Sequence, residues 1–190
     1  SFSYPVKSIV IHAGVTDIGD YAFYKSSKLV SVEIPDTVTS IGTYAFGSCD
    51  SLVTLEIPDS VTSIANHAFS GSKSLESLVI PDSVTAIGED AFSHCTSLTN
   101  IKLPANITAI SKQMFRECNS LTSIDLPDSI TRIDVHAFAY CTSLTNLDIP
   151  DNVTSIGNFA FINCSNLKSI SIPASVPSIG DYAFSSCNAL

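Results

Sequence analysis

The chain repeats a 23-residue unit, and this period limits its fold more than any other feature of the sequence. The unit is clearest in residues 29–51, LVSVEIPDTVTSIGTYAFGSCDS, and eight copies run in constant register from Val6 to Ala189. A unit this short cannot bury its apolar residues alone, so neighbouring copies must stack and share one continuous core. The period therefore predicts a solenoid in which each copy forms one coil.

Each copy opens with an apolar block of the form L-x-x-I-x-I, as in Leu75, Leu78 and Ile80. The alternation in the second half of this block is typical of a short strand with one buried face. Proline follows the block in seven of the eight copies, and because proline has no N–H to give to a ladder, it ends each strand at the same height. A second apolar pair, such as Val84 and Ile87, then points inward at a bend or a short strand pair.

A glycine follows the second apolar pair in five copies, and an Ala-Phe pair lies just beyond it. Because Ala65, Ser111 and Asp134 also occupy the glycine position, we expect this position to need a close backbone approach and not a positive φ. Phenylalanine stands at one height in every copy, which predicts a spine of stacked, buried rings. The segment around it is too short for a full helix, so we expect a 3₁₀ turn or a single helical turn opposite the strands.

All six cysteines occupy one column of the repeat, where the other two copies hold Ser26 and Ser72. Neighbouring coils cannot pair all of them, since Cys49 has serine in both adjacent copies and the other five are consecutive. Second-nearest coils lie about 9.6 Å apart, which is beyond disulfide reach. A straight line of thiolates also makes no tetrahedral metal site. We therefore expect six reduced thiols that are buried as small apolar groups.

The pattern L-x-x-I-x-I-P-D-S-V-T-x-I-G-x-x-A-F-x-x-C-x-S resembles the BspA-like class of leucine-rich repeats, from Val6 to Leu190. The resemblance implies a leucine-rich-repeat array of a surface or secreted protein, with adhesion to host proteins such as fibronectin and fibrinogen. We accordingly expect residues 1–190 to form a single β-rich solenoid (α+β or all-β), as a fragment of a longer protein. Phe2 and Tyr4 are candidates for a partial lid over its first coil.

Charge and composition exclude several functions. The net charge is −9, the isoelectric point is near 4.6, and the nine Lys and Arg form no basic stripe, which argues against nucleic acid. No run of 18 apolar residues is present, so this fragment should not insert into a membrane. His67 and His136 share a column but lie about 14 Å apart, and no Ser-His-Asp or Cys-His set stands out. We expect no enzyme, no cofactor and no metal.

An aspartate column follows the prolines and places like charges in register, which costs under about 1 kcal/mol per contact in water. Calcium could relieve this repulsion, but Ala105 and Ala174 interrupt the column. The spacing also lacks the glycine-rich nonapeptide of calcium-binding β-rolls. We interpret the Pro-Asp-Ser and Pro-Asp-Thr sequences as turns with Asx-type hydrogen bonds.

Two columns vary as a binding face should. The first is the outward strand position between the two apolar residues, and its candidate binding residues are Glu33, Glu56, Val79, Lys102, Asp125 and Asp148. The second column precedes Ala-Phe and contains Tyr21, Tyr44, His67, Asp90, Gln113, His136, Phe159 and Tyr182. Exposed aromatics and histidines in a row are residue types that interfaces prefer. The alternative for both columns is an ordinary solvated face, and for the second column it is also a set of rings that shelter the Phe spine.

We choose the strand column as the binding face of a protein- or glycan-binding domain, in an adhesin at the cell surface or secreted. The expected partner is a protein of the host extracellular-matrix type, or a glycan. Two acidic blocks flank Val79 and Lys102, which favours a basic or mixed-charge protein segment. The alternative is a purely structural spacer with no binding activity of its own.

Overall fold

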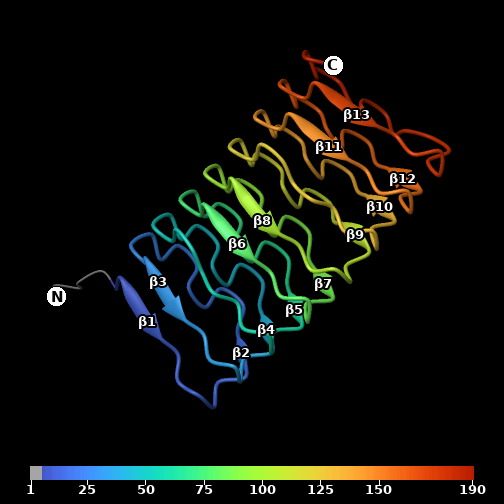
Figure 1. Cartoon of the computed structure of the whole chain (residues 1–190). Coiled ribbons are helices and arrows are strands. Elements are labelled where there is room, and N and C mark those ends of the chain that lie inside the picture. The colour runs from blue at the N-terminus through green and yellow to red at the C-terminus, as the bar shows by residue number, and fades with distance from the viewer. Residues whose placement is uncertain (1–5) are drawn as a thin grey trace.

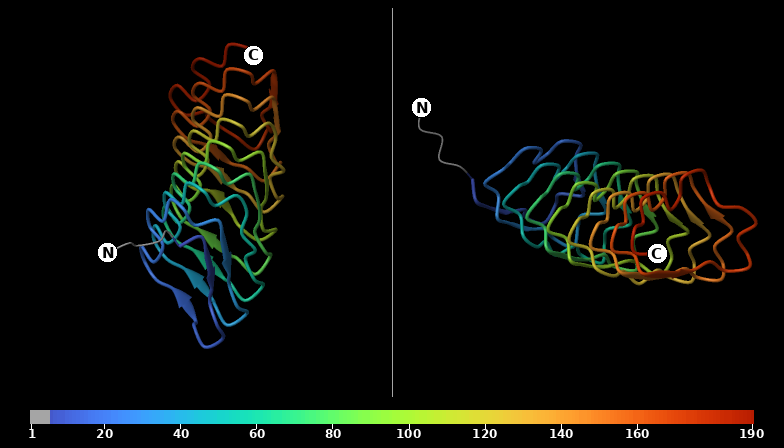
Figure 2. Two further views of the ribbon diagram at one scale, coloured as in Figure 1. Left: turned by 90° about the vertical axis from the view of Figure 1, so that its left-hand side faces the viewer. Right: turned by 90° about the horizontal axis from the view of Figure 1, so that it is seen from above.

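The computed structural model describes residues 6–190 as one continuous stack of coils. Phe2 and Tyr4, the candidates for a lid, lie outside the described residues. Successive coils follow one another from the N-terminal to the C-terminal end, and each is rotated slightly relative to the one before (Figures 1 and 2). The predicted β-rich solenoid of 23-residue coils is confirmed.

Two rows of short parallel strands run along the stack. The first row comes from the L-x-x-I-x-I block and comprises β1 (Ser8–Val10), β3 (Ser31–Glu33), β6 (Ser77–Val79), β8 (Asn100–Lys102), β11 (Asn146–Asp148) and β13 (Ser169–Ser171). The second row ends at the isoleucine of V-x-x-I and comprises β2 (Asp17–Ile18), β4 (Ser40–Ile41), β5 (Ser63–Ile64), β7 (Ala86–Ile87), β9 (Ala109–Ile110), β10 (Arg132–Ile133) and β12 (Ser155–Ile156). Pairing is in register at a spacing of one repeat, as for Ser77 with Asn100. A proline turn separates the two rows, and in it the Val84 N–H donates to the Pro81 carbonyl oxygen at 3.0 Å.

The serine, threonine or asparagine of each proline turn bonds to the coil before it. The Ser60 and Ser83 hydroxyls donate to the carbonyl oxygens of Val38 and Val61, at 2.6 and 2.7 Å. This differs from the expected Asx-type turn bond, because these side chains satisfy a carbonyl of the preceding coil. The polar residue of the turn therefore helps to hold neighbouring coils together.

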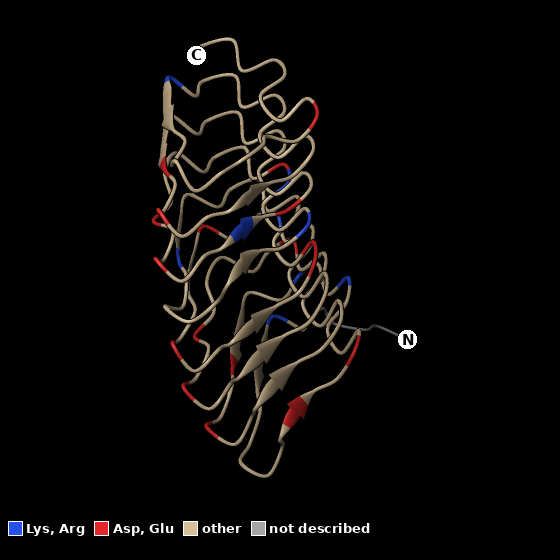
Figure 3. Cartoon of the chain, turned by 90° about the vertical axis from the view of Figure 1, so that its right-hand side faces the viewer, with Lys and Arg blue, Asp and Glu red and all other residues tan. Residues whose placement is uncertain are grey.

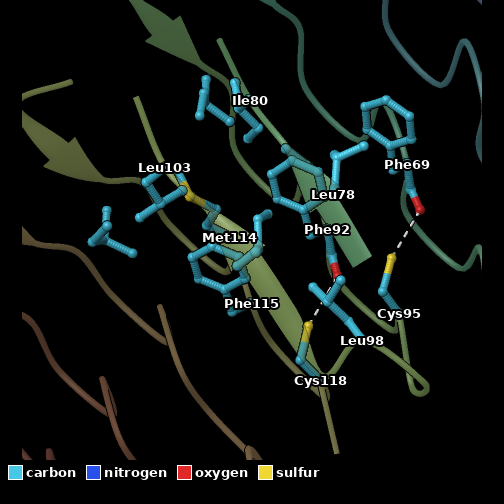
Figure 4. Packing of buried hydrophobic residues seen from close by; sticks show 14 of the residues in the cluster. Phe69, Leu78, Ile80, Phe92, Cys95, Leu98, Leu103, Met114, Phe115 and Cys118 are labelled. Atoms are coloured by element: carbon cyan, nitrogen blue, oxygen red, sulfur yellow. Dashed lines mark hydrogen bonds between the residues drawn. The ribbon is translucent and has the colours of Figure 1, made fainter. Parts of the chain in front are cut away.

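The core is the predicted spine of phenylalanine rings. Phe46, Phe69, Phe92, Phe115, Phe138 and Phe161 are fully buried. Neighbouring rings are nearly parallel, with Phe69 and Phe92 separated by 5.5 Å between centroids and 12° between planes. Figure 4 shows part of this stack, with Leu78, Leu98 and Leu103 packed around it. Each ring is worth roughly 1.5–3 kcal/mol in buried apolar surface.

The segment that carries the Phe ring is a turn, and the predicted helical turn is absent from residues 6–190. We call this segment, residues 44–48 and its equivalents in the other coils, the Phe turn. Its first and last residues are left-handed, as at Tyr44 (φ 54°) and Ser48 (φ 56°), although left-handed backbone costs about 1–2 kcal/mol for a residue with a Cβ. Alternate N–H groups have different acceptors. The N–H groups of Tyr44, Phe46 and Ser48 donate to carbonyl oxygens of the next coil, and the two N–H groups between them donate to the carbonyl oxygen three residues earlier in the same coil.

This alternation produces a hydrogen-bond ladder that a helix could not make. Three such bonds join the Phe turns of every pair of neighbouring coils, as in Phe92 N–H to Met114 O at 3.0 Å. A helical turn would direct all of its N–H groups along its own axis and leave the coils unconnected at this corner. The bonds between coils offset the cost of the left-handed residues.

The glycine after the second strand row allows coils to approach closely, as predicted. A Cβ at Gly42 would lie 2.7 Å from both the backbone nitrogen and Oδ1 of Asp20. A Cβ at Gly180 would lie 2.7 Å from Oδ1 of Asn158, and one at Gly88 would meet Asn66 in the same way. In these three places an Asp or Asn of one coil accepts an N–H of the next, as Asp20 does from Thr43 N–H at 2.6 Å.

Ser111 interrupts the second row. The strand order is β2-β4-β5-β7 on one side and β9-β10-β12 on the other, with no ladder between β7 and β9. At Gly88 the backbone N–H donates to the Ile64 carbonyl oxygen at 2.9 Å, whereas at Ser111 the hydroxyl replaces it and donates to Ile87 O at 2.7 Å. The larger Met114 replaces the usual alanine in this same coil and is fully buried.

Candidate binding face

The six candidate binding residues all lie exposed on the outer side of the first strand row, which we call the strand face. Val79 is 61% exposed, although it lies in the middle of the array. It pairs in register with Glu56 on one side and Lys102 on the other. The same alternation that directs Leu78 into the core directs these side chains outward. The structure thus brings the six residues together on one face and leaves that face uncovered.

Hollows recur along the strand face. One, of about 940 Å³, extends from Ser31 to Lys102 and includes Glu56 and Val79 in its lining. A second, of about 900 Å³, is lined by four carboxylates, those of Glu33, Asp36, Glu56 and Asp59. The third is smaller, at about 200 Å³, and lies between Asp125 and Asp148. The hollows therefore coincide with the candidate residues.

The carboxylates of the strand face have no cationic partner within residues 6–190. The ion pairs lie elsewhere, for example between Arg116 Nη2 and Glu117 Oε1 at 3.1 Å, and His94 Nδ1 lies 2.9 Å from Glu117 Oε2. Lys112 with Glu89 and Arg132 with Asp134 complete the set. Acidic residues recur at the turns along one edge of the stack, whereas Lys and Arg are few (Figure 3). The acidic charge of the strand face is thus not neutralised by the chain itself.

The aromatic column is part of the Phe turn, and its rings pack on one another. Tyr44 and His67 stack at 4.4 Å and 1° between planes, and Phe159 and Tyr182 stack at 5.3 Å and 5°. Since the faces meet within the stack, the edges of the rings are turned to solvent. Asp90 differs from the expected surface position: it is buried and accepts a hydrogen bond from Gln113 Nε2 at 3.0 Å. Every residue of this column has a positive φ.

The cysteine column makes a specific bond that its spacing does not reveal. Each thiol donates to the carbonyl oxygen of the phenylalanine 26 residues earlier, as Cys118 does to Phe92 O at 3.2 Å (Figure 4). Where serine replaces cysteine, the Ser72 hydroxyl donates to Phe46 O in the same way, at 2.6 Å. The exchange of cysteine for serine in this column was the signal of the hydrogen bond in the sequence, because the two side chains have little in common except that each can donate a hydrogen bond.

The thiols are free and mostly buried. Five are buried, as predicted, and Cys187 is half-buried. Burial raises the pKa of the Cys95 thiol to about 12 and that of Cys49 to about 11, because a thiolate is poorly solvated there. These thiols are therefore poor nucleophiles and poor metal ligands at neutral pH.

No group of three or more His, Cys, Asp or Glu side chains converges to hold a metal ion within residues 6–190. His94 contacts the Glu117 carboxylate, and burial, together with the nearby charges of Arg116 and Lys112, lowers the pKa of His136. The same part of the chain contains no helix with the length and hydrophobicity to cross a membrane.

Several solved structures resemble this chain. A leucine-rich repeat protein from Bacteroides ovatus is 33% identical with a TM-score of 0.87, over 97% of this chain and 54% of that one. The leucine-rich repeat protein of T. pallidum is 35% identical with a TM-score of 0.80, over 84% of this chain and 77% of that one. A leucine-rich cell surface protein from Faecalibacterium prausnitzii is 30% identical with a TM-score of 0.61, over 87% of this chain and 59% of that one.

The chain thus spans about half the length of the Bacteroides structure that it matches. Among curated protein sequences, none matches it. The family model of the BspA type leucine rich repeat region, in six copies, matches residues 2–78 and 62–190. With the 23-residue coil, the Phe spine and the paired strands all in place, this chain belongs to the BspA-type leucine-rich repeat family.

Proposed function

We propose that this chain is a protein-binding repeat domain whose strand face receives the partner. The observation that carries the proposal is the strand face itself, where six variable and exposed residues lie in register on an uncovered sheet. Arrays of this family are in general binding or adhesion scaffolds and not enzymes. The unneutralised charge and the hollows of this face both favour it over the aromatic column.

We further propose that the domain is the adhesive region of a larger cell-surface or secreted protein. The Faecalibacterium protein of similar fold is described as a cell surface protein, and the Bacteroides structure extends well beyond the part that this chain matches. The partner is a protein of the extracellular-matrix type in preference to a glycan. Sugar rings stack on exposed aromatic faces, and the faces that meet within the aromatic column, as those of Tyr44 and His67 do, are closed to a sugar.

Central contacts usually dominate affinity, which places the greatest weight on Val79 and Lys102. The test measures binding of the intact chain to immobilised fibronectin and fibrinogen, with two double variants of matched size. Val79→Asp with Lys102→Glu should weaken binding by about tenfold or more, whereas Tyr44→Ser with Tyr182→Ser should leave it within about twofold. The opposite result would move the binding surface to the aromatic column.

A structural spacer is the second candidate, because the Phe-turn ladder joins all neighbouring coils and should make the array stiff. A spacer would bind neither fibronectin nor fibrinogen, and it would bind no glycan of an array. The substitutions at Val79 and Lys102 would then have no binding to change. Binding of either protein that the strand-face variant abolishes would exclude the spacer.

A further inference from the structure

The strand face presents four positions, of three kinds, in a fixed order along the stack. Glu33 and Glu56 form an acidic position, Val79 an apolar one, Lys102 a basic one, and Asp125 with Asp148 a second acidic one. The neighbouring aspartates of the proline turns reinforce the first acidic position, since Asp36 and Asp59 line the same hollow as the two glutamates. The order is therefore acidic, apolar, basic, acidic.

The spacing of these positions matches one particular ligand geometry. Coils are about 4.8 Å apart, so measured from Glu33 the four positions lie at about 2.4, 9.6, 14.4 and 21.6 Å, each acidic pair being taken at its midpoint. In an extended chain alternate side chains point to the same side and are about 6.7 Å apart. Four alternate residues placed from 2.4 Å would then fall at about 2.4, 9.1, 15.8 and 22.5 Å. Every residue lands within about 1.5 Å of a position of the strand face.

We propose that the strand face binds an extended protein segment with the pattern basic-x-apolar-x-acidic-x-basic, lying along the axis of the stack. Each side chain of that pattern meets its complement: a cation at each acidic pair, an apolar group on Val79 and a carboxylate at Lys102. The proposal rests on the proposed binding function and adds the chemistry and register of the ligand. The pattern is read from the Glu33 end of the face to the Asp148 end; because the contacts come from side chains, a segment that runs in the opposite direction satisfies it with the reversed sequence.

A metal ion explains the same carboxylates less well. Within residues 6–190 no three acidic, histidine or cysteine side chains come close enough to share an ion, so the charge is spread along the face. Lys102 and the exposed Val79 also have no role in holding a cation. A cationic ligand distributed over about 20 Å, with a non-basic centre, fits both facts.

The experiment compares two fluorescent peptides of identical composition and charge, with Ser or Thr at the x positions. In the first, Arg, Leu, Glu and Arg occupy the four alternate positions; in the second, the order is Leu, Arg, Arg and Glu. The first should bind at least about tenfold more tightly to the intact chain. Equal affinities would overturn the proposal, because they would show only attraction between opposite net charges.

A charge exchange tests the register directly. Lys102→Glu should weaken binding of the first peptide by about tenfold. Replacement of the peptide glutamate by lysine should then restore the affinity for this variant. The double variant Glu33→Gln with Glu56→Gln should lower the affinity for the first peptide about fivefold. The matched control, Glu89→Gln with Asp181→Asn, removes two charges elsewhere and should change that affinity by less than about twofold. Equal losses in both double variants, or displacement of the peptide by calcium chloride beyond that by sodium chloride of equal ionic strength, would contradict it.

The failure of this inference can be told from failure of the proposed function. If both peptides bind equally while Val79→Asp with Lys102→Glu still abolishes capture of fibronectin or fibrinogen, the strand face is a binding surface with a different ligand pattern. If that double variant also leaves protein capture unchanged, the binding function of this face is itself wrong.

Discussion

The Phe turns and the first strand row, two sides of the same coil, differ in how regularly they connect neighbouring coils. The Phe turns are joined by three backbone hydrogen bonds between every pair of coils, and their ring stack is unbroken. In the first strand row, as far as residues 6–190 describe it, ladders of full strands join only β1 to β3, β6 to β8, and β11 to β13. The side with left-handed backbone and no helix or strand is thus the more uniform of the two.

This difference indicates a division of roles within each coil. The Phe turn holds the stack together through backbone bonds and buried rings, so its phenylalanine cannot vary. The strand face contributes less to cohesion, so its outward residues are free to differ from coil to coil, as Glu56, Val79 and Lys102 do. A binding surface can then change without loss of the fold, as is usual in solenoids.

The largest expected effect tests this division. Phe92→Ala removes a fully buried ring from the middle of the stack and should lower the free energy of unfolding by about 3–5 kcal/mol. Val79→Ala on the strand face should change it by less than about 0.5 kcal/mol. Urea titration of both variants measures the two values. Similar losses would show that the strand face is as important to stability as the Phe turn.

The next effect concerns the close approach of coils and uses two glycines of the same column. Gly88→Ala places a Cβ against Asn66 of the preceding coil and should cost about 1–3 kcal/mol. At Gly19 a Cβ would meet nothing within 4 Å, so Gly19→Ala should be neutral or stabilise by up to about 1 kcal/mol. The comparison is made by thermal and urea unfolding. If both substitutions cost the same, the strain comes from the backbone conformation and not from the neighbouring coil.

The smallest effect concerns the buried thiols and is seen as a dependence on pH. Burial holds the pKa of the Cys118 thiol well above that of an unfolded cysteine, so the folded state keeps a proton that the unfolded state loses. This stabilisation is fully present below the unfolded thiol pKa of about 9 and decreases as the pH rises, by about 1.4 kcal/mol per buried thiol between pH 7 and 10.

Cys118→Ser provides the control, since it retains a donor for the Phe92 carbonyl and does not ionise in this range. Its free energy of unfolding should therefore fall less between pH 7 and 10 than that of the unchanged chain. Urea titrations at the two pH values, with reductant present, give the difference. Parallel decreases in both proteins would mean that the Cys118 thiol ionises as readily in the folded chain as in the unfolded one.

The buried columns could be read from the sequence because burial repeats every 23 residues, and Leu78, Ile80 and Phe92 needed no further information. The exposure of Val79 and Lys102 followed from strand alternation. The left-handed Phe turns could not be predicted, because the two positions hold residues as different as Tyr21, Glu117 and Phe159, and a glycine only at Gly71. The ligand of the strand face was beyond prediction from the repeat pattern, since outward residues obey no packing constraint.

Repeat arrays gain and lose whole copies during evolution, and the contact between Asn66 and Gly88 limits which copies can be lost. Deletion of residues 75–97 would stack Asn66 directly beneath Ser111, where the side chain of one coil and the Cβ of the next would compete for the same space. Deletion of residues 98–120 would instead stack Glu89 beneath Asp134 and create no such conflict of an Asn with a Cβ. The copies look interchangeable, yet at three junctions an Asp or Asn of one coil requires a glycine in the next, so only some copies can be removed without a clash.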